Sequence, residues 1–256
     1  MKYFRYYLGV VILIISQLSV ISAEKASSLL HFKCPYGNSD CLVKMYDLLI
    51  KDLSDGKPEY NIPPLDPVYI KKFNIRTNFL GPFNVHVVYE NAKFSGVKNT
   101  TTKKFTGFSR DFDGKQNELV LFTPKYTLSG NYIVNGTMFS VPIRATGSST
   151  IILFNVYTRL RFISRKMEKD GEIYAQAEKM QMSAKFDRLK LEFDSSRSEN
   201  KLLEEVAAEY VNANWKESFN AAKESIYESF GEIWTKIYNQ ITSKIPYRDF
   251  FVEESA

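Results

Sequence analysis

The feature of this sequence that most constrains its fold is a long apolar stripe near the C-terminus. Apolar residues recur there at steps of three or four, with a single longer step, until Pro246 ends the pattern. The members of the stripe are Leu202, Val206, Tyr210, Trp215, Phe219, Ala222, Ile226, Phe230, Ile233, Ile237, Ile241 and Ile245. This spacing predicts about 45 helical residues, or about 65 Å of helix. A break near Asn212 to Asn214 and a weak point at Gly231 are compatible with it.

A helix of this length needs a partner that covers it, because globular helices usually run about 10–15 residues. Its bulky aromatic stripe does not match the a and d positions of a coiled coil. From Asn84 to about Phe193, strand-like segments instead alternate with turn signals. These signals are Asp113-Gly114, Ser129-Gly130-Asn131, Asn135-Gly136, Gly147-Ser148 and Asp170-Gly171. We therefore predict an α+β fold in which a highly curved antiparallel sheet wraps around the long C-terminal helix.

The N-terminal part of the chain predicts a shorter helix and a stiff connector. Apolar residues between Leu42 and Leu53 recur at helical spacing, and Gly56 and Pro58 stop the helix. The segment 62–70 then carries three prolines within five residues, which excludes a helix interior or a central strand. Because it also contains apolar side chains, we expect it to pack on the body of the protein.

Residues 1–23 have the order of a secretory signal peptide, with a basic start, a short apolar run and a small-residue end at Ala23. The apolar run is too short for a membrane span, so we expect residues 24–256 to form one secreted domain. The two cysteines, Cys34 and Cys41, are then expected to form a disulfide, with a reactive dithiol as the alternative. Asn99 and Asn135 begin N-x-[ST] sequons and are candidate N-glycosylation sites.

The sequence offers little for catalysis, metal binding or nucleic-acid binding. The chain carries a modest net charge of +5 without a long basic stripe, which argues against nucleic acid as a partner. Its two histidines lie far apart, and no zinc-protease, phosphate-loop or nucleophile-elbow motif occurs. Glu204 and Glu205 are expected on the solvated face of the last helix. We predict neither enzymatic activity nor a cofactor nor a metal site.

Four motifs, in this order, resemble those of the insect takeout and juvenile-hormone-binding-protein family. They are the Cys34 and Cys41 pair before a helix, the proline-rich segment 62–67, Asn212-Ala213-Asn214-Trp215, and the C-terminal segment 245–251. The resemblance implies a tubular lipid-binding fold with a hydrophobic tunnel, and transport of small lipophilic molecules in haemolymph or other extracellular fluid. Takeout-type members are linked to circadian, feeding and courtship physiology. A single cysteine pair follows the takeout pattern and leaves juvenile hormone itself in doubt as the ligand.

The function predicted from these observations is binding and transport of a small apolar ligand, such as a terpenoid or fatty acid, inside an apolar tunnel. The alternative is a secreted interaction or regulatory module whose aromatic side chains fill the core. We expect a monomer without stable membrane insertion, and with transient contact to a membrane or cell-surface receptor at most. The predicted tunnel residues are Val87, Phe122, Tyr132, Val134, Phe154, Val156, Tyr157, Trp215, Phe219, Ile226, Phe230 and Ile233.

Overall fold

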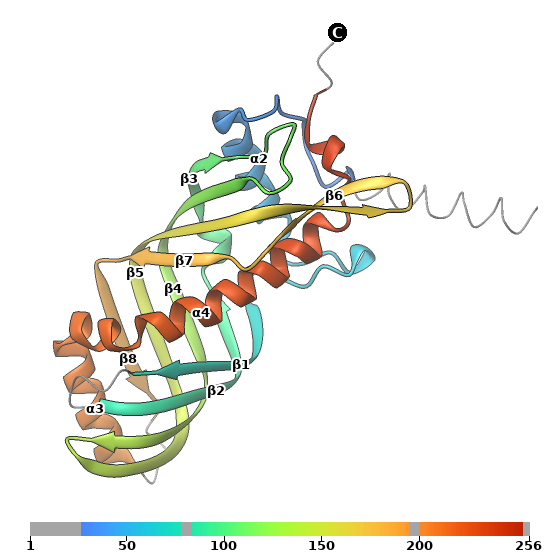
Figure 1. Ribbon diagram of the computed structural model, residues 1–256. Helices are drawn as coiled ribbons and strands as arrows, with labels where there is room; N and C mark the ends of the chain where they lie inside the picture. The colour runs from blue at the N-terminus through green and yellow to red at the C-terminus, as the bar shows by residue number, and fades with distance from the viewer. Residues whose placement is uncertain (1–26, 78–82, 195–199, 253–256) are drawn as a thin grey trace, which may run out of the picture.

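The computed structural model describes residues 27–77, 83–194 and 200–252. The molecule is elongated, and a curled antiparallel sheet wraps around helices that run along its concave side (Figure 1). The predicted signal peptide, residues 1–23, lies outside the described residues. The α+β prediction, with a long C-terminal helix inside a curved sheet, is confirmed.

The sheet contains two unusually long strands, β4 (Gln116–Met138) and β5 (Val141–Lys169), which form one hairpin. The remaining strands are β1 (Val68–Arg76), β2 (Phe83–Ser95), β3 (Thr101–Thr106), β6 (Glu172–Ala177), β7 (Gln181–Lys185) and β8 (Arg188–Phe193). These strands pair only in antiparallel fashion, and the path β1-β2-β4-β5-β6 forms the main order, with β3 on β4 and with β7 and β8 on β5. Strands of this length must twist and curl, which gives the sheet its concave face.

Several predicted turns prove wrong, because their glycines serve close packing inside β4 and β5. Ser129 to Asn131, Asn135-Gly136 and Gly147-Ser148 all lie within strands. The hairpin turn instead falls at Phe139-Ser140, where both residues have positive φ. At Gly136 a Cβ atom would lie 2.1 Å from a backbone oxygen of the neighbouring strand β2, so only glycine fits. The turn predicted at Asp170-Gly171 is confirmed, since both residues are left-handed between β5 and β6.

The C-terminal pattern forms two helices, α3 (Lys201–Ala213) and α4 (Trp215–Thr242). Asn214 lies between them with φ −116° and ψ 40°. The helix therefore breaks within the segment Asn212 to Asn214, which the sequence indicates as compatible with a break. Gly231 is not a weak point. It lies inside α4, and a Cβ atom there would be 2.4 Å from the Met180 carbonyl oxygen. The glycine therefore lets the β6–β7 connection touch the helix.

Polar side chains of α3 and α4 attach the helices to exposed edges of the sheet. The Asn239 amide bonds both backbone groups of Ala177, and the Asn212 amide does the same for Leu191. The Tyr227 hydroxyl bonds both backbone groups of Ala184, and Ser225 bonds both of Arg76. These side chains supply the hydrogen bonds that a neighbouring strand would otherwise make to the backbone groups at the edge of the sheet. The helices are thus held at fixed positions over the concave face.

The end of the molecule opposite the β4–β5 hairpin turn is covered by a third layer, which we call the α2 end (Figure 1). It consists of α2 (Ser39–Asp52), the short helices η1 (Pro58–Tyr60) and η2 (Val97–Asn99), and the C-terminal η4 (Tyr247–Phe250). The helix expected from Leu42 to Leu53 is confirmed. The proline-rich connector packs on the body as expected, with backbone hydrogen bonds to the Leu53 and Ser54 carbonyls, but its end forms strand β1, which the sequence pattern did not predict.

Candidate ligand-binding cavity

An apolar cavity of about 230 Å³ lies between the concave face of the sheet and helices α3 and α4. We call it the outer cavity, because it lies at the end of the molecule that carries the β4–β5 hairpin turn. Its apolar walls come from strands β1, β2, β4, β5 and β8 and from both helices. They include Ile75, Val87, Val134, Ile143, Ile151, Leu191, Leu203, Val211, Phe219 and Ile226.

The outer cavity is open because small side chains occupy positions where other parts of the interior carry aromatic rings. Ala207, Ala221 and Ala222 line it from the helices, and Ala145 lines it from β5. The side chains tying the helices to the sheet edges keep this space from collapsing. An apolar concavity of this kind, with few polar groups, is typical of small-molecule sites.

One buried carboxylate interrupts the apolar lining. Glu204, on α3, is only 2% exposed, and its Oε1 accepts a 2.6 Å hydrogen bond from the Tyr132 hydroxyl of β4. Burial, followed by the hydrogen bond and charge of Glu204, raises the pKa of Tyr132, so this hydroxyl keeps its proton and remains a donor. The placement of Glu204 on the solvated helix face is therefore wrong, whereas Glu205 is exposed as expected.

A second buried hydroxyl of the outer cavity is already paired with the sheet. The hydroxyl groups of Tyr89 and Ser149 lie 2.7 Å apart, and Tyr89 is almost completely buried. Burial raises the pKa of Tyr89 to about 12. This hydrogen bond satisfies the phenol within the protein, so the Glu204 and Tyr132 pair is the more prominent polar feature of the cavity.

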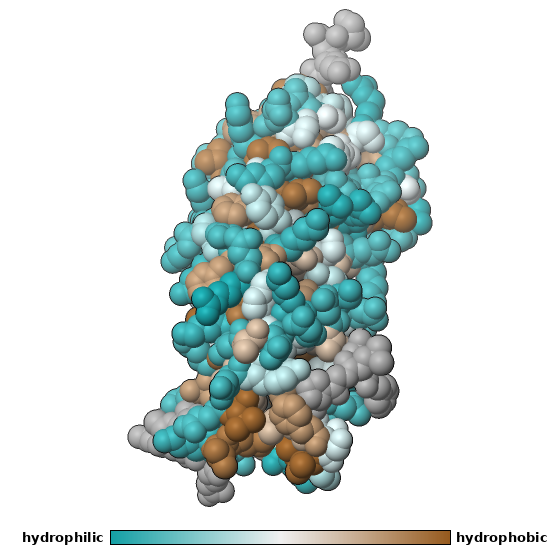
Figure 2. Space-filling model, turned by 90° about the vertical axis from the view of Figure 1, so that its left-hand side faces the viewer, coloured by the Kyte–Doolittle hydropathy of each residue, from teal (hydrophilic) through white to brown (hydrophobic). Residues whose placement is uncertain are grey.

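Aromatic and aliphatic side chains surround the hairpin end of the outer cavity. The ring of Phe139, at the β4–β5 turn, lies 5.7 Å from Phe83 and 5.6 Å from Tyr210, both of which line the cavity. Phe139, Val141 and Leu202 are 51%, 61% and 75% exposed, respectively. Figure 2 shows apolar side chains gathered at this end of an otherwise largely hydrophilic surface. This end combines a cavity with an exposed apolar rim.

The middle of the molecule is filled mainly by aromatic rings. The Phe94 ring lies 4.9 Å from Phe230 and 4.7 Å from Tyr126, and Phe230 lies 4.9 Å from Phe73. A cavity of only about 40 Å³ remains here. It shares Phe219 and Ile226 with the lining of the outer cavity. These two side chains therefore separate the two spaces.

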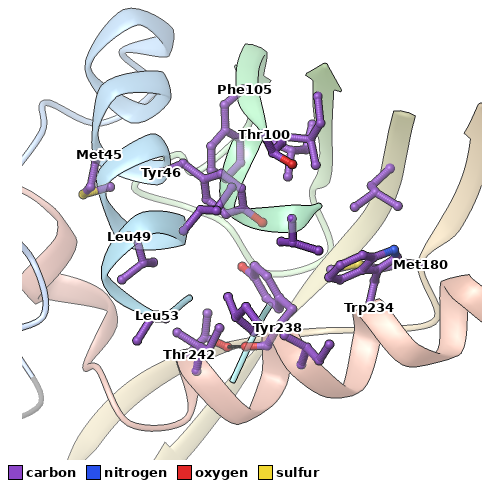
Figure 3. A pocket seen from close by; sticks show the side chains of 18 of the residues that line it. Met45, Tyr46, Leu49, Leu53, Thr100, Phe105, Met180, Trp234, Tyr238 and Thr242 are labelled. Atoms are coloured by element: carbon purple, nitrogen blue, oxygen red, sulfur yellow. Dashed lines mark hydrogen bonds between the residues drawn. The ribbon is translucent and has the colours of Figure 1, made fainter. Parts of the chain in front are cut away.

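A third space, the inner cavity, lies beneath α2 and has a volume of about 70 Å³ (Figure 3). Tyr46 of α2 faces Tyr238 of α4 across it, and Met45 and Trp234 also line it. Burial raises the pKa of Tyr46 and of Tyr238, so both hydroxyls keep their protons at neutral pH. Trp234 also lines the middle cavity. The outer, middle and inner cavities thus lie in a row, and the outer cavity is the largest of these three.

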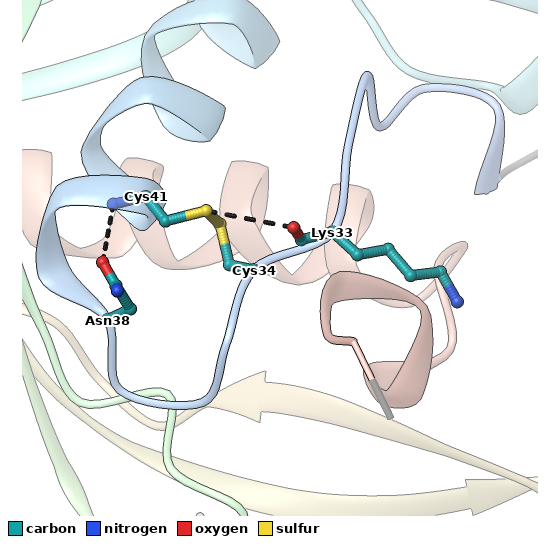
Figure 4. Close-up of a disulfide and its surroundings, with 4 residues drawn as sticks. All are labelled: Lys33, Cys34, Asn38 and Cys41. Carbon is teal, nitrogen blue, oxygen red and sulfur yellow. Dashed lines mark hydrogen bonds between the residues drawn. A yellow bond between two sulfur atoms is a disulfide. The ribbon is translucent and has the colours of Figure 1, made fainter. Parts of the chain in front are cut away.

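The disulfide predicted between Cys34 and Cys41 is confirmed, with an S–S distance of 2.00 Å (Figure 4). The Asn38 side chain accepts a hydrogen bond from the Cys41 backbone N–H and caps the first turn of α2. Backbone hydrogen bonds join Cys34 to Phe250 and Val252. The disulfide loop therefore ties the start of α2 to the C-terminal segment.

The sequence model of the family "Haemolymph juvenile hormone binding protein (JHBP)" matches residues 10–252 of this chain. The chain belongs to the JHBP family. The circadian clock-controlled protein daywake is 23% identical in Drosophila yakuba and 21% identical in Drosophila melanogaster, each over 87% of both chains. The crystal structure of Takeout 1 from Epiphyas postvittana has the same fold, with a TM-score of 0.71, 17% identity, and coverage of 86% of this chain and 99% of that chain.

In this JHBP-family chain, the structure brings seven of the twelve predicted tunnel residues to the cavities. Val87, Tyr132 and Val134 line the outer cavity. Phe219 and Ile226 line both the outer and the middle cavity, and Val156 and Phe230 line only the middle one. Which of these residues contact a ligand remains a prediction.

The other five predicted tunnel residues do not line these cavities. Phe122 and Tyr157 lie on the convex face of the sheet, with their rings 4.9 Å apart. Phe154 is also absent from the walls, because the left-handed residue Asn155 shifts the alternation of β5 and places Leu153 and Val156 inward. The last two belong to α4. Trp215 packs on Phe186, and Ile233 faces a groove beside the proline-rich connector.

Asn99 and Asn135, the candidate glycosylation sites, are both exposed, and glycan attachment at either remains a prediction. Within 27–77, 83–194 and 200–252, no group of three or more His, Cys, Asp or Glu side chains is placed to hold a metal ion. Among the helices that the structure describes, none is both long and apolar enough to cross a membrane.

Proposed function

We propose that this JHBP-family protein binds a small apolar molecule in the outer cavity, carries it in extracellular fluid and catalyses no reaction on it. The observation that carries this proposal is the apolar cavity of about 230 Å³ between the sheet and the helices. A chain that served only as an interaction module with a filled core would have no reason to keep this space open with alanines.

The energetics of the outer cavity suit an apolar ligand. Each Å² of apolar surface removed from water contributes about 25 cal/mol before the costs of binding are subtracted. The cavity volume lies slightly below the roughly 300–1,000 Å³ of typical ligand pockets. A ligand with a longer chain therefore has to move Phe219 and Ile226 and extend into the middle cavity.

We also propose that ligand exchange takes place at the hairpin end. Exposed Phe139, Val141 and Leu202 surround that end and give an apolar molecule a path that avoids charged groups. A transient contact with a membrane or a receptor would occur here, with the protein otherwise a monomer.

Residues 1–23 are proposed to direct secretion and to be removed from the mature protein. The Cys34–Cys41 disulfide is in keeping with an oxidising compartment such as extracellular fluid. The side chains of the cavity wall determine which apolar molecule is bound.

Binding of a fluorescent apolar dye, such as N-phenylnaphthylamine, tests this function. We expect the dye to bind the wild-type protein and to be displaced by long-chain alcohols or esters. Ala207→Trp places a large ring in the outer cavity and should weaken dye binding at least about tenfold. Ala213→Trp adds the same ring at an exposed position at the end of α3 and serves as the control. Equal dye binding by both variants would contradict the proposal.

A further inference from the structure

Two aromatic side chains that were expected in the tunnel lie on the convex face of the sheet, outside the cavities. Phe122 of β4 and Tyr157 of β5 pair in register, with their ring centroids 4.9 Å apart. The Lys103 ammonium of β3 lies over the Phe122 ring, 5.4 Å from its centroid, and is attracted to the ring electrons. Lys103 therefore covers Phe122, whereas Tyr157 is 50% exposed and can contact a partner.

Cations from three strands gather around these rings, although they lie far apart in the sequence. Lys185 of β7 pairs in register with Tyr157. In the next row of the same face, Lys104 of β3 and Arg159 of β5 flank β4 on either side. Neighbouring strands lie about 4.8 Å apart, so the four strands β3, β4, β5 and β7 span about 14 Å. We call this set the convex patch: Lys103, Lys104, Phe122, Tyr157, Arg159, Arg161 and Lys185.

Three cations of the convex patch share a single carboxylate. Glu118 of β4 lies 2.8 Å from Arg161 Nε and 3.1 Å from Lys104 Nζ. Arg159 Nε approaches the same carboxylate at 3.8 Å. The hydrogen bond from Arg161, followed by that from Lys104, lowers the pKa of Glu118, so this carboxylate is ionised at neutral pH. One negative charge thus faces three positive charges.

The two other cations, Lys103 and Lys185, form no ion pair with any residue in 27–77, 83–194 or 200–252. The carboxylates at the margins of the convex patch have other partners. Asp47 accepts a hydrogen bond from a backbone N–H of β3, and Asp187 accepts one from the Asn155 amide. Because exposed ion pairs are weak, anions of a ligand can also compete with Glu118 for its cations. The convex patch therefore suits a partner with several negative charges.

We propose that the convex patch binds a sulfated polysaccharide and so holds the protein at a cell surface or in extracellular matrix. The exposed Tyr157 ring stacks on the apolar face of a sugar ring, and the surrounding cations bind the sulfate groups. A linear chain can follow the outward curvature of the sheet, whereas a flat bilayer would touch only its crest. The convex patch lies on the opposite face of the sheet from the outer cavity, so both sites can be occupied together.

Calorimetric titration of the protein with a heparin octasaccharide at increasing salt concentration tests this proposal. The affinity of the wild-type protein should fall linearly with salt on a double logarithmic scale, because binding releases counterions from the polyanion. Lys103→Ala/Lys185→Ala should weaken binding at least about tenfold and make the salt dependence shallower. Lys71→Ala/Lys72→Ala removes two exposed lysines of β1, outside the convex patch. This charge-matched control should change the affinity by less than about twofold.

The contribution of the aromatic ring is tested separately from that of the charges. Tyr157→Ala keeps every charge and should weaken octasaccharide binding several-fold without changing the salt dependence. Tyr157→Phe retains the ring and should bind as the wild-type protein does. Thermal melts of each variant establish that it is folded, and all of them should bind the apolar dye with the affinity of the wild-type protein.

Three outcomes would overturn the inference. The first is a wild-type protein that does not bind the octasaccharide at physiological salt, which requires no variant to fold. The second is equal weakening in the two double-lysine variants, since binding would then follow net charge alone. The third is tighter binding to phosphatidylserine vesicles than to the octasaccharide, with no effect of Tyr157→Ala, which would make an acidic lipid surface the partner. Dye binding is measured independently in each case, so failure of this inference leaves the proposed carrier function standing.

Discussion

The outer cavity and the α2 end are built from the same layers, a curled sheet against helix, yet they differ in what fills the space. At the α2 end, Phe105, Phe108, Tyr247, Phe250 and Phe251 pack ring on ring beneath the disulfide loop. At the hairpin end, alanines occupy comparable inward positions and leave about 230 Å³ open. Side-chain size, rather than backbone architecture, therefore decides which end can take a ligand.

This difference in side-chain packing also suits the two ends to different roles, the α2 end to stability and the hairpin end to ligand binding. Aromatic rings in contact bury a large apolar area and add about 0.5–1.5 kcal/mol per pair beyond that area. The α2 end has many such pairs, whereas fewer of them surround the outer cavity, among them Phe83 with Tyr210 and Tyr132 with Phe193. We infer that packing at the α2 end provides most of the stability, and that the hairpin end binds the ligand.

The largest contrast is expected from removal of one aromatic ring at each end. Phe251 is 1% exposed and stacks on Tyr36 with ring centroids 4.1 Å apart. Phe251→Ala should cost about 3–5 kcal/mol of unfolding free energy, because it creates a buried void. Phe83→Ala, beside an existing cavity, should cost less than half as much. Urea unfolding of both variants measures these values, and equal losses would contradict the division between the ends.

Loss of the disulfide should affect stability without affecting binding. Cys34 and Cys41 are separated by seven positions, and a loop of this size contributes about 2–3 kcal/mol in the chain-entropy model. The Cys34→Ser/Cys41→Ser double variant should therefore unfold at lower urea concentration, yet bind the apolar dye with the affinity of the wild-type protein. A large loss of dye affinity in the folded double variant would show that the two ends are coupled.

Gly231→Ala tests the contact that holds the middle of α4 to the sheet. The added methyl group would lie 2.4 Å from the Met180 carbonyl oxygen, so the helix or the β6–β7 connection must shift. We expect a loss of about 1–3 kcal/mol from this overpacking. Ala208→Gly, at a half-buried position inside α3, is the control, because it measures the ordinary difference in helix propensity between the two residues. If Gly231→Ala left the free energy of unfolding unchanged, the contact with Met180 would not hold α4 to the sheet.

The smallest effect concerns alkaline pH and should be common to both ends. Burial raises the pKa of Tyr89, at the outer cavity, from the ordinary 10.0 to about 12, and it also raises the pKa of Tyr46 at the α2 end. The unfolded chain releases these protons near pH 10, so the stabilisation is complete below that pH and is lost as pH rises toward 12. Urea unfolding at increasing pH should show this decline, and unchanged stability between about pH 9 and about pH 11 would contradict it.

The order and type of the main elements could be predicted from the sequence because they follow from periodicity. The C-terminal stripe, the strand region and the segment Leu42 to Leu53 all formed as expected. Turns were harder to predict. Gly136 and Gly147 resemble turn residues, but they are needed where a neighbouring strand or side chain approaches closely. A single sequence does not distinguish these two uses of glycine.

The walls of the candidate site could be predicted only in part, because two local irregularities change which residues face inward. Asn155 shifts the alternation of β5, so Phe154 does not point into the cavities. The break at Asn214 shifts the phase of the helical stripe, so that Leu203 and Ala207 face the outer cavity while Leu202 is exposed. The same shift moves Glu204 from the expected solvated face into the wall.

Native mass spectrometry of the protein purified from the medium of secreting eukaryotic cells tests the central claim most directly. The account predicts a complex of one chain with about one small apolar molecule, which organic solvent extracts. It predicts that this molecule is retained by Ala213→Trp and lost from Ala207→Trp, whose added ring fills the outer cavity. A bound molecule retained by both variants, or a wild-type chain that carries none and takes up no apolar probe, would contradict the account.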